Sequence, residues 1–311
     1  MEKQLISIAM TTYNGEAFLQ AQLDSILSQS YKEFELVICD DNSSDKTWAI
    51  LFEYEKKDKR VRIFRNEQNI GFVKNFEKAV SLCTGDYIAL SDQDDIWEKK
   101  HLEVLLHNLN SATASFGNAV IMDAKSEICT DLLSKRDRYF VNGTNEDKLT
   151  RILFYGNPFQ GTSSLYKKII FDYALPIPSG IEYHDAWFAA VSCCLNGLNY
   201  TYEVVTNYRI HGRNASGSHK WNLFEQIISS LKRSGWKTDR TIFCEELEKR
   251  IPNMTYEIKT IVKQAYVFQK ERLEGKRIKT IFRVIKNYKK IYSMNSHKYM
   301  ISRCIAILFR G

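Results

Sequence analysis

The stretch Tyr87-Ile88-Ala89-Leu90-Ser91-Asp92-Gln93-Asp94-Asp95-Ile96-Trp97 places an apolar run directly before a cluster of carboxylates. The first four residues are typical of a buried strand, and Ile96 with Trp97 would hold the acidic loop against the core. In open α/β sheets, ligands bind beyond the carboxyl ends of the strands. The stretch therefore predicts an α/β fold with Asp92 and Asp94 at a binding edge of its sheet.

Upstream of this stretch, short apolar runs alternate with helical patterns, which is typical of βα units and a mainly parallel sheet. Strands are expected at residues 5–11, 34–39 and 61–64, and a helix at 73–82. The second strand runs into Asp40-Asp41-Asn42-Ser43-Ser44-Asp45, a cluster of turn and helix-capping residues. We expect Asp40 and Asp41 to meet Asp92 and Asp94 in one crevice, although they are far apart in the sequence.

Downstream, the pattern predicts a succession of shorter elements. They are a helix at 99–109, a strand at 119–122, a loop-rich stretch to about residue 150, a strand at 163–166, a helix at 185–195 and a strand at 200–208. From Trp221 onward the pattern is helical. The last expected helix carries an apolar stripe at spacings of three and four residues, opposite a Lys and Arg face, formed by Ile278, Ile281, Phe282, Ile285, Tyr288 and Ile291.

The charge is unevenly distributed along the 311 residues. The net charge is +7, but the chain from Lys220 onward holds 21 Lys and Arg against 8 Asp and Glu, so the first 219 residues are mildly acidic. We therefore expect a catalytic domain at 1–219 and a basic helical region at 220–311. The seven scattered cysteines form no Cys-x-x-Cys pair, which favours a reducing compartment. The beginning of the sequence indicates no signal peptide, and no apolar run is long enough to span a bilayer.

The acidic loops are suited to a divalent cation. Mg²⁺ and Mn²⁺ prefer oxygen ligands, and with nucleotides they are held by few carboxylates together with phosphate oxygens. An Asp-x-Asp pair is common on protein surfaces, where it is only a solvated loop. The strand before Asp92 and the apolar residues after Asp95 favour the metal site over that alternative.

Five motifs in order resemble the family 2 glycosyltransferases of the GT-A fold, and within them the bacterial rhamnosyltransferases, over roughly the first 215 residues. They are Thr11-Thr12-Tyr13-Asn14, Asp40-Asp41-Asn42-Ser43-Ser44-Asp45, Asn69-Ile70-Gly71, Ser91-Asp92-Gln93-Asp94-Asp95-Ile96-Trp97 and His184-Asp185. The resemblance implies a GT-A sheet with a C-terminal helical extension. It also implies inverting transfer of a sugar from a nucleoside diphosphate to a hydroxyl.

The resemblance assigns the donor site to two of these motifs. Thr11 and Tyr13 would bind the base, and Asp41, with Asp40 as the alternative, would accept the N3 proton of a pyrimidine. Asp92 would face the ribose and the water shell of the metal, and Asp94 would ligate Mg²⁺ or Mn²⁺. Tyr13 as a core aromatic and the two Asp residues as helix caps are the structural alternatives.

Asp185 matches the position of the family's catalytic base, with a helix cap as the structural alternative. Many relatives have Glu-Asp here, whereas His184-Asp185 is the variant associated with the rhamnosyltransferase branch. His211 matches a histidine that closes over the diphosphate and would bind metal or phosphate, although a lone histidine also serves structural roles. Diphosphate or sugar contacts are further expected from Lys74, Asn75 and Arg209. Gln160-Gly161-Thr162-Ser163 would line the acceptor site, unless it is a plain transition from loop to strand.

The resemblance makes dTDP-β-L-rhamnose the leading donor, with a UDP-sugar as the alternative, and a glycan or lipid-linked glycan of a cell-surface polysaccharide as acceptor.

The acid-free segment 275–311 holds ten Lys or Arg. It would bind an anionic membrane at the inner face of the cell, or else pack on the catalytic domain with a solvated basic face. No stacking platform for nucleic acid is evident. The alternatives are an inactive sugar-nucleotide-binding or scaffold protein and a nucleotidyltransferase, and the latter would need a Gly-rich loop that residues 11–17 do not supply.

Overall fold

The computed structural model describes residues 4–132, 143–154, 156–211, 240–291 and 304. Within these ranges nine strands form one sheet, in the order β3-β2-β1-β4-β8-β6-β9-β5, with β7 paired to β6. The strands are β1 (Ile6–Thr12), β2 (Phe34–Asp40), β3 (Val61–Arg65), β4 (Tyr87–Ser91), β5 (Ile96–Trp97), β6 (Ala114–Met122), β7 (Ile128–Leu132), β8 (Ser164–Lys167) and β9 (Leu198–Arg209).

The first four strands confirm the expected α/β fold. β2, β1 and β4 are parallel neighbours, with β3 parallel on the outside, and the residues of β1 are all buried. Such strands are apolar on both faces because helices cover both sides of the sheet. Beyond β4, β8 runs antiparallel to its neighbours, and β6 and β9 are again parallel to each other. The carboxyl ends of β1, β2 and β4 therefore meet at one edge, as the sequence predicts.

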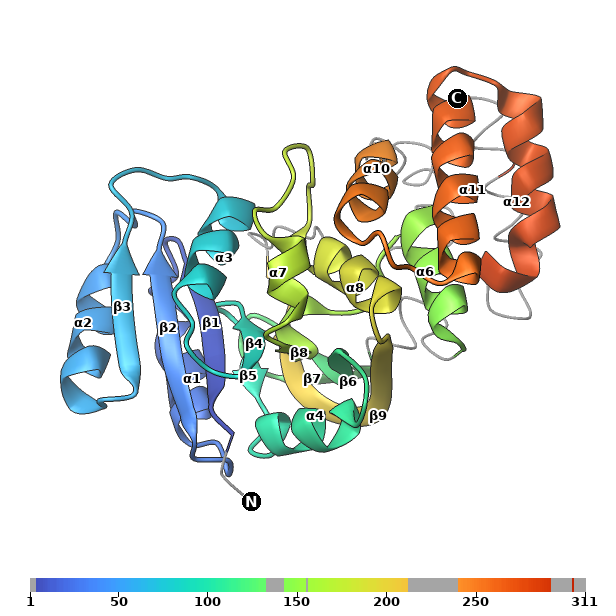
Figure 1. The fold of residues 1–311 in the computed structure, drawn as a ribbon. Coiled ribbons are helices and arrows are strands. Elements are labelled where there is room, and N and C mark those ends of the chain that lie inside the picture. The colour runs from blue at the N-terminus through green and yellow to red at the C-terminus, as the bar shows by residue number, and fades with distance from the viewer. Residues whose placement is uncertain (1–3, 133–142, 155, 212–239, 292–303, 305–311) are drawn as a thin grey trace.

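The helices follow the strands and continue into a C-terminal group (Figure 1). They are α1 (Leu19–Leu27), α2 (Thr47–Lys57), α3 (Phe72–Ser81), α4 (His101–Leu109), α6 (Asn145–Phe154), α7 (Ile170–Ala174), α8 (His184–Cys194), α10 (Thr241–Arg250), α11 (Tyr256–Leu273) and α12 (Arg277–Ile291), with a 3₁₀ turn η1 (Gly161–Ser163) before β8. In Figure 1, α11 and α12 lie at the opposite end of the molecule from β3 and α2.

The expected loop-rich stretch up to residue 150 is wrong in its described parts, because β7 lies within it and α6 begins within it. Helix α6 is hard to see in the sequence, since its buried residues include Lys148 and Arg151. The Lys148 Nζ atom donates to the Leu198 carbonyl over 2.7 Å, so a charged side chain can face the interior here. Because Lys and Arg are usually exposed, their presence at buried positions makes the sequence pattern of this helix resemble that of a surface helix.

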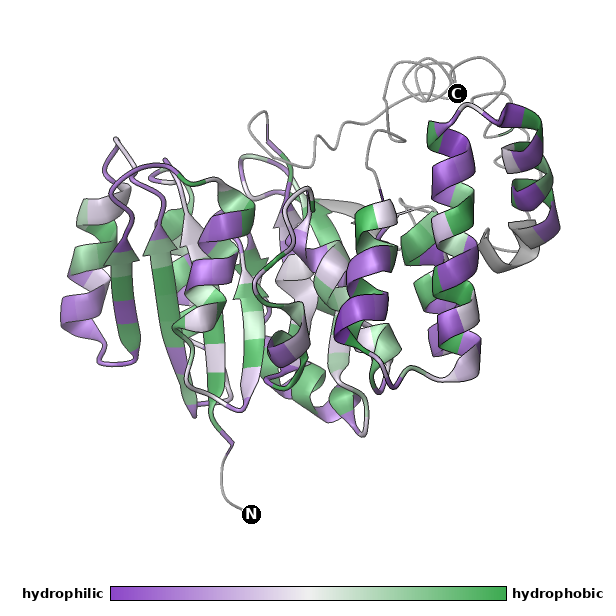
Figure 2. Cartoon of the chain, turned by 45° about the horizontal axis from the view of Figure 1, so that its top comes forward, coloured by the Kyte–Doolittle hydropathy of each residue, from purple (hydrophilic) through white to green (hydrophobic). Residues whose placement is uncertain are grey.

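The C-terminal helices share a hydrophobic core with the sheet domain. Phe243 of α10, Phe268 of α11 and Val284 of α12 belong to the same buried cluster as Trp187 of α8 and Leu153 of α6. The colouring of Figure 2 shows apolar strands and helices that alternate between apolar and polar residues. The expected boundary at residue 219, like the start of the helical pattern at Trp221, lies outside the described residues.

Helix α12 has a buried face and a separate exposed apolar face, where the sequence predicted one apolar stripe. Thr280 and Val284 are fully buried, whereas Ile278, Phe282 and Ile285 are exposed. Because these three residues are spaced by four and three, they lie on one side of the helix. None of the helices in the described ranges combines the length and apolar character needed to span a bilayer.

Candidate active site

A cleft of about 450 Å³ opens at the carboxyl ends of β1, β2 and β4. It brings together residues from all five sequence motifs. Its walls are formed by Thr11, Thr12, Tyr13, Asp41, Asn69, Gly71, Phe72, Asn75, Phe76, Asp92, Gln93, Asp94, Gln160, Gly161, Thr162, Tyr183, His184, Asp185 and Tyr208.

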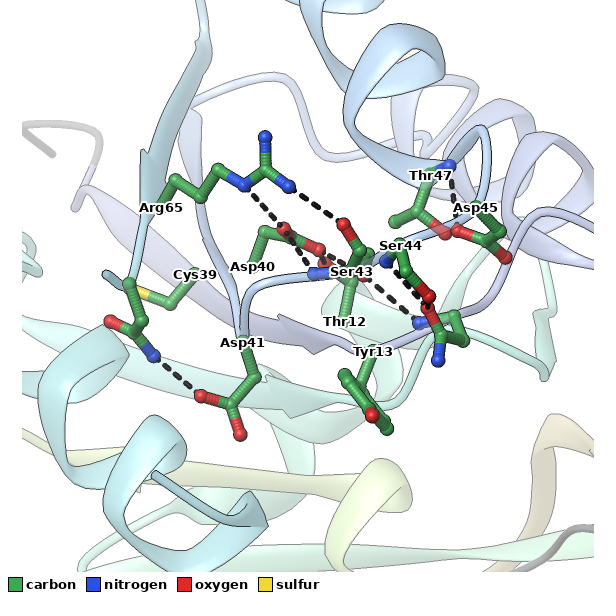
Figure 3. A network of polar contacts seen from close by, with 12 residues as sticks. Thr12, Tyr13, Cys39, Asp40, Asp41, Ser43, Ser44, Asp45, Thr47 and Arg65 are labelled. Atoms are coloured by element: carbon green, nitrogen blue, oxygen red, sulfur yellow. Dashed lines mark hydrogen bonds and ion pairs between the residues drawn. The ribbon is translucent and has the colours of Figure 1, made fainter. Parts of the chain in front are cut away.

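The two adjacent carboxylates after β2 have separate tasks. Asp40 is fully buried and outside the cleft wall, where it accepts hydrogen bonds from the Thr12 hydroxyl (2.9 Å) and the Ser43 amide (3.0 Å). Arg65 completes its shell, with Nε 3.5 Å from Oδ2. Figure 3 shows the Asp40 carboxylate turned toward these partners and Asp41 pointing away from them. Asp40 therefore holds the loop together from outside the cleft wall, whereas Asp41 is the member of the pair that lines the cleft.

Asp41 is held by donors from the loop before α3. Its Oδ1 atom accepts from Asn66 Nδ2 (2.8 Å) and the Ile70 amide (2.9 Å), and Oδ2 accepts from the Gly71 amide (2.9 Å). Gly71 has φ +83°, a left-handed conformation that favours glycine, and it precedes the first residue of α3. Among the described residues the Gly71 amide is the one donor to Oδ2, and a carboxylate oxygen accepts about two hydrogen bonds, so Asp41 keeps capacity for an N–H group of a ligand.

Gln93, the middle residue of Asp-x-Asp, links the loop after β4 to the loop after β1. Its Oε1 atom accepts from the Tyr13 amide (2.8 Å), and its Nε2 atom donates to the Tyr13 carbonyl (3.0 Å). Gly15 makes this approach possible, because a Cβ atom there would lie 2.2 Å from Gln93 Oε1. The sequence analysis missed this role, because a middle position carries no pattern of its own. Tyr13 is half exposed, so it is not a core aromatic.

Asp94 and His211, the two residues to which the resemblance assigns the metal, are in direct contact. His211 Nε2 lies 2.8 Å from Asp94 Oδ2, and the imidazole packs on Phe18 with ring centroids 4.9 Å apart. Arg209 is buried beneath them, outside the cleft wall. Its Nε atom donates to the Asp94 carbonyl (2.7 Å) and its amide to Asp95 Oδ1 (3.0 Å), so its observed role is to fix the acidic loop.

The donor set of the cleft fits a divalent cation bound together with a diphosphate. Asp94 and His211 offer a carboxylate and an imidazole at one point, and Asp92 lies in the same wall. In the described part of the chain, no cluster of three His, Cys, Asp or Glu side chains could hold a metal by itself. Mg²⁺ is usually held by one or two carboxylates, with substrate phosphates and water completing its shell. The arrangement is therefore suited to a shared cation rather than to an all-protein cage.

Asp185 lies in the first turn of α8 and, like Asp41, lines the cleft. Its Oδ1 atom accepts from the Ala186 amide over 2.6 Å, and Gly161 of η1 packs closely against its Cβ atom. Burial raises the pKa of Asp185 to about 6, against the lowering effect of hydrogen bonds from Ala186 and Asn157. Burial, followed by the charges of Asp94 and Asp185, raises the pKa of Asp92 to about 7. A carboxylate with a raised pKa in a cleft is suited to proton transfer near neutral pH.

Of the remaining residues expected to contact the diphosphate or a sugar, some line the cleft and others do not. Lys74 is not part of the cleft wall, since its Nζ atom is 3.0 Å from Glu77 and also donates to the Ile177 carbonyl. Asn75 does line the cleft, but its amide is engaged with Cys39 and Asn66. From the segment 160–163, Gln160, Gly161 and Thr162 reach the wall. Ser163 instead donates to Thr206 over 2.9 Å.

The family model described as "Glycosyl transferase family 2" matches residues 7–171. The glucosyltransferase WfaP of Escherichia coli, named for transfer from UDP-Glc to α-D-GlcNAc-diphosphoundecaprenol, is 28% identical over 78% of this chain and 91% of its own. An uncharacterised glycosyltransferase of Methanocaldococcus jannaschii is 30% identical over 68% of this chain and 73% of its own.

Two solved structures share the fold. Residues 1–349 of Staphylococcus aureus TarS in complex with UDP-GlcNAc superpose with a TM-score of 0.59 at 16% identity, over 93% of this chain and 78% of TarS 1–349. The mannosyltransferase PcManGT of Pyrobaculum calidifontis, in complex with GDP-Man and Mn²⁺, gives 0.54 at 16% identity, over 98% and 87%. With its GT-A sheet and the matched family model, the chain belongs to glycosyl transferase family 2 and is a glycosyltransferase.

Proposed function

We propose that the protein transfers a sugar, with inversion, from a pyrimidine nucleoside diphosphate to a hydroxyl of a lipid-linked cell-surface glycan precursor. One observation carries this proposal: a single cleft is lined both by a carboxylate acceptor held in place by donors, Asp41, and by a carboxylate of raised pKa, Asp185. The first suits recognition of a base, and the second suits removal of a proton.

The donor class follows from the hydrogen bonds around Asp41. Uracil and thymine both carry an N3–H donor, which Asp41 Oδ2 would accept, while Thr11 and Tyr13 flank the base. WfaP, which is named for UDP-Glc, supports a UDP-sugar donor. The dTDP-β-L-rhamnose expected from the His184-Asp185 motif is the second donor in this class, and it would yield an α-rhamnoside.

The reaction is a single displacement. The acceptor hydroxyl gives its proton to the Asp185 carboxylate while its oxygen attacks the anomeric carbon, and the bond from that carbon to the diphosphate breaks on the opposite face. Asp185 needs to be ionised beforehand, and a pKa of about 6 keeps it ionised at pH 7 yet basic enough to take the proton. The backbone amide of Ala186 orients the carboxylate.

We further propose that Asp94 and His211 hold Mg²⁺ or Mn²⁺, with Asp92 facing its water shell and the ribose. When bound, the cation would neutralise charge on the leaving diphosphate. The Mn²⁺ in the PcManGT complex supports this choice of ion. Arg209 contributes indirectly, since it fixes the backbone of Asp94 and Asp95.

Helix α12 supports a membrane-bound acceptor. Its exposed residues Ile278, Phe282 and Ile285 form an apolar stripe, and Lys279 and Lys286 follow about 100° around the helix. An apolar stripe with flanking cations fits the surface of an anionic bilayer. We propose a peripheral position on the inner face of the cell membrane, where a lipid-linked glycan would be presented.

Calorimetric titration of the full chain with UDP, dTDP and GDP, each with Mn²⁺ and with EDTA, tests the donor site. We expect metal-dependent binding of UDP and dTDP and weaker binding of GDP. An Asp41→Asn variant should lose about tenfold in affinity, because one acceptor for N3–H becomes a donor. The matched control is Asp172→Asn, an exposed acid on α7, which should bind like the wild type.

Donor turnover is then measured with UDP-glucose, UDP-GlcNAc and dTDP-rhamnose. Release of UDP or dTDP that depends on an added GlcNAc-diphospholipid supports the proposal. Metal-dependent binding without turnover of any donor would favour the inactive sugar-nucleotide-binding alternative. Equal binding of all three nucleotides would contradict the assignment of Asp41.

A further inference from the structure

His184 is a polar side chain in an aromatic wall of the cleft. Its imidazole stacks on Phe76 with centroids 3.9 Å apart and an interplanar angle of 27°. Phe188 and Phe72 meet it edge-on, at 5.8 and 6.2 Å. The side chain is more than nine-tenths buried and still belongs to the cleft wall. The ring is therefore held by packing, and the small exposed part of the residue lies at the cleft wall.

Within the described residues, the Nδ1 atom of His184 is buried and has no hydrogen-bond partner. Leaving a polar atom unpaired in a protein interior costs about 1–3 kcal/mol, and a phenylalanine would fill the same space without that cost. Burial also lowers the pKa of His184 to about 3, so the ring is neutral and presents one donor and one acceptor nitrogen. A neutral imidazole beside Asp185 adds no positive charge that would weaken the base.

Two exposed aromatic rings border the same part of the cleft. Phe72 is 42% exposed and Tyr183 is 43% exposed, and their centroids lie 6.1 Å apart. Large aromatic side chains at the mouth of a cleft are suited to stacking against a flat, partly apolar ligand surface. The carbon face of a pyranose has this character, and its hydroxyl groups lie around the edge.

We propose that His184 is a specificity-determining residue that hydrogen-bonds a hydroxyl of the saccharide bound beside Asp185, while Phe72 and Tyr183 pack on the carbon face of that sugar. This inference rests on the proposed function and adds the chemistry by which a sugar is recognised. The sugar belongs either to the donor or to the acceptor. A site built to hydrogen-bond a hydroxyl discriminates strongly against a ligand that lacks it, because its polar group is then left unpaired.

The test compares His184→Phe, which keeps the aromatic packing, with His184→Gln, which keeps a donor and an acceptor. Affinities for UDP and for UDP-glucose, both with Mn²⁺, separate the nucleotide from the sugar. If the hydroxyl is on the donor, His184→Phe binds UDP like the wild type and UDP-glucose about tenfold more weakly. If it is on the acceptor, both affinities stay unchanged and KM for a GlcNAc diphosphate carrying a short alkyl chain rises about tenfold.

In either case, His184→Gln should recover part of the loss, and the melting temperature of His184→Phe should equal or exceed that of the wild type. A purely structural role predicts the reverse: His184→Phe keeps wild-type sugar affinity and acceptor KM. That result would overturn the inference. The proposed function fails separately, if the wild-type protein itself binds no pyrimidine nucleotide and turns over no donor.

Discussion

Two pairs of carboxylates lie in or beside the cleft, Asp40 and Asp41 after β2, and Asp92 after β4 with Asp185 at the start of α8, but their surroundings differ. The first pair is surrounded by donors: hydroxyls, backbone amides, Asn66 and Arg65. Burial raises the pKa of both members of the second pair, and for Asp92 the charges of Asp94 and Asp185 add to this effect.

The difference separates two kinds of carboxylate. Donors that surround Asp40 and Asp41 fix their positions, as recognition of a rigid base requires. Buried acids of raised pKa destabilise the folded protein while they are ionised and unpaired, so binding a proton or a cation stabilises it. Three substitutions test this comparison, in order of decreasing effect.

The largest effect is expected from Asp185→Asn, in the pair whose pKa values are raised. The amide cannot take the acceptor proton, so we expect kcat to fall by about 10³-fold. Affinity for UDP with Mn²⁺ should change less than twofold, because Asp185 does not contact the nucleotide in the proposed arrangement. Initial rates of UDP release, together with calorimetry, check both parts. Asp172→Asn is the matched control, and wild-type turnover by Asp185→Asn would remove Asp185 as the base.

On the side rich in donors, Asp40→Asn should act mainly on stability. The change places an amide opposite the Ser43 N–H and removes the charge that pairs with Arg65, so the free energy of unfolding should fall by about 2–3 kcal/mol. Urea denaturation measures it. If Asp40 instead contacted the base, nucleotide affinity would fall while the denaturation midpoint stayed within error of the wild type.

The sequence predicted the region around β1 to β4 well, because its strands are buried on both faces and appear as unbroken apolar runs. The four expected strands end within one residue of those observed. Helix α6 was missed because Lys148 and Arg151 occupy its buried face. The exposed stripe of α12 was also hidden, since periodicity identifies apolar positions but not which of them are covered.

Within the site, the motifs predicted where the cleft lies but not which contacts each of its residues makes. Asp40 and Asp41 are equivalent in the sequence, and only the direction in which each side chain leaves the end of β2 separates them. Gln93 gave no separate signal and His184 was noted only as the neighbour of Asp185, because their contacts with Tyr13 and Phe76 are visible only in the structure. Such contacts depend on how loops from distant segments come together, which a local pattern does not encode.

The smallest effect, and the one of opposite sign, is expected from Asp92→Asn. Because the folded-state pKa of Asp92 is about 7, the folded protein binds this proton more tightly than the unfolded chain does. The free energy of unfolding therefore falls as the pH rises from about 4 to about 7. Asp92→Asn removes that loss, so in EDTA it should be more stable than the wild type at pH 8, by on the order of 1 kcal/mol. The advantage should shrink as the pH falls through 7 and vanish near 4.

Glu182→Gln, at an exposed position, is the control and should show no such dependence. If Asp92→Asn is instead less stable than the wild type, the neighbours of Asp92 stabilise its charge, as those of Asp40 do. The contrast between the two pairs would then be wrong.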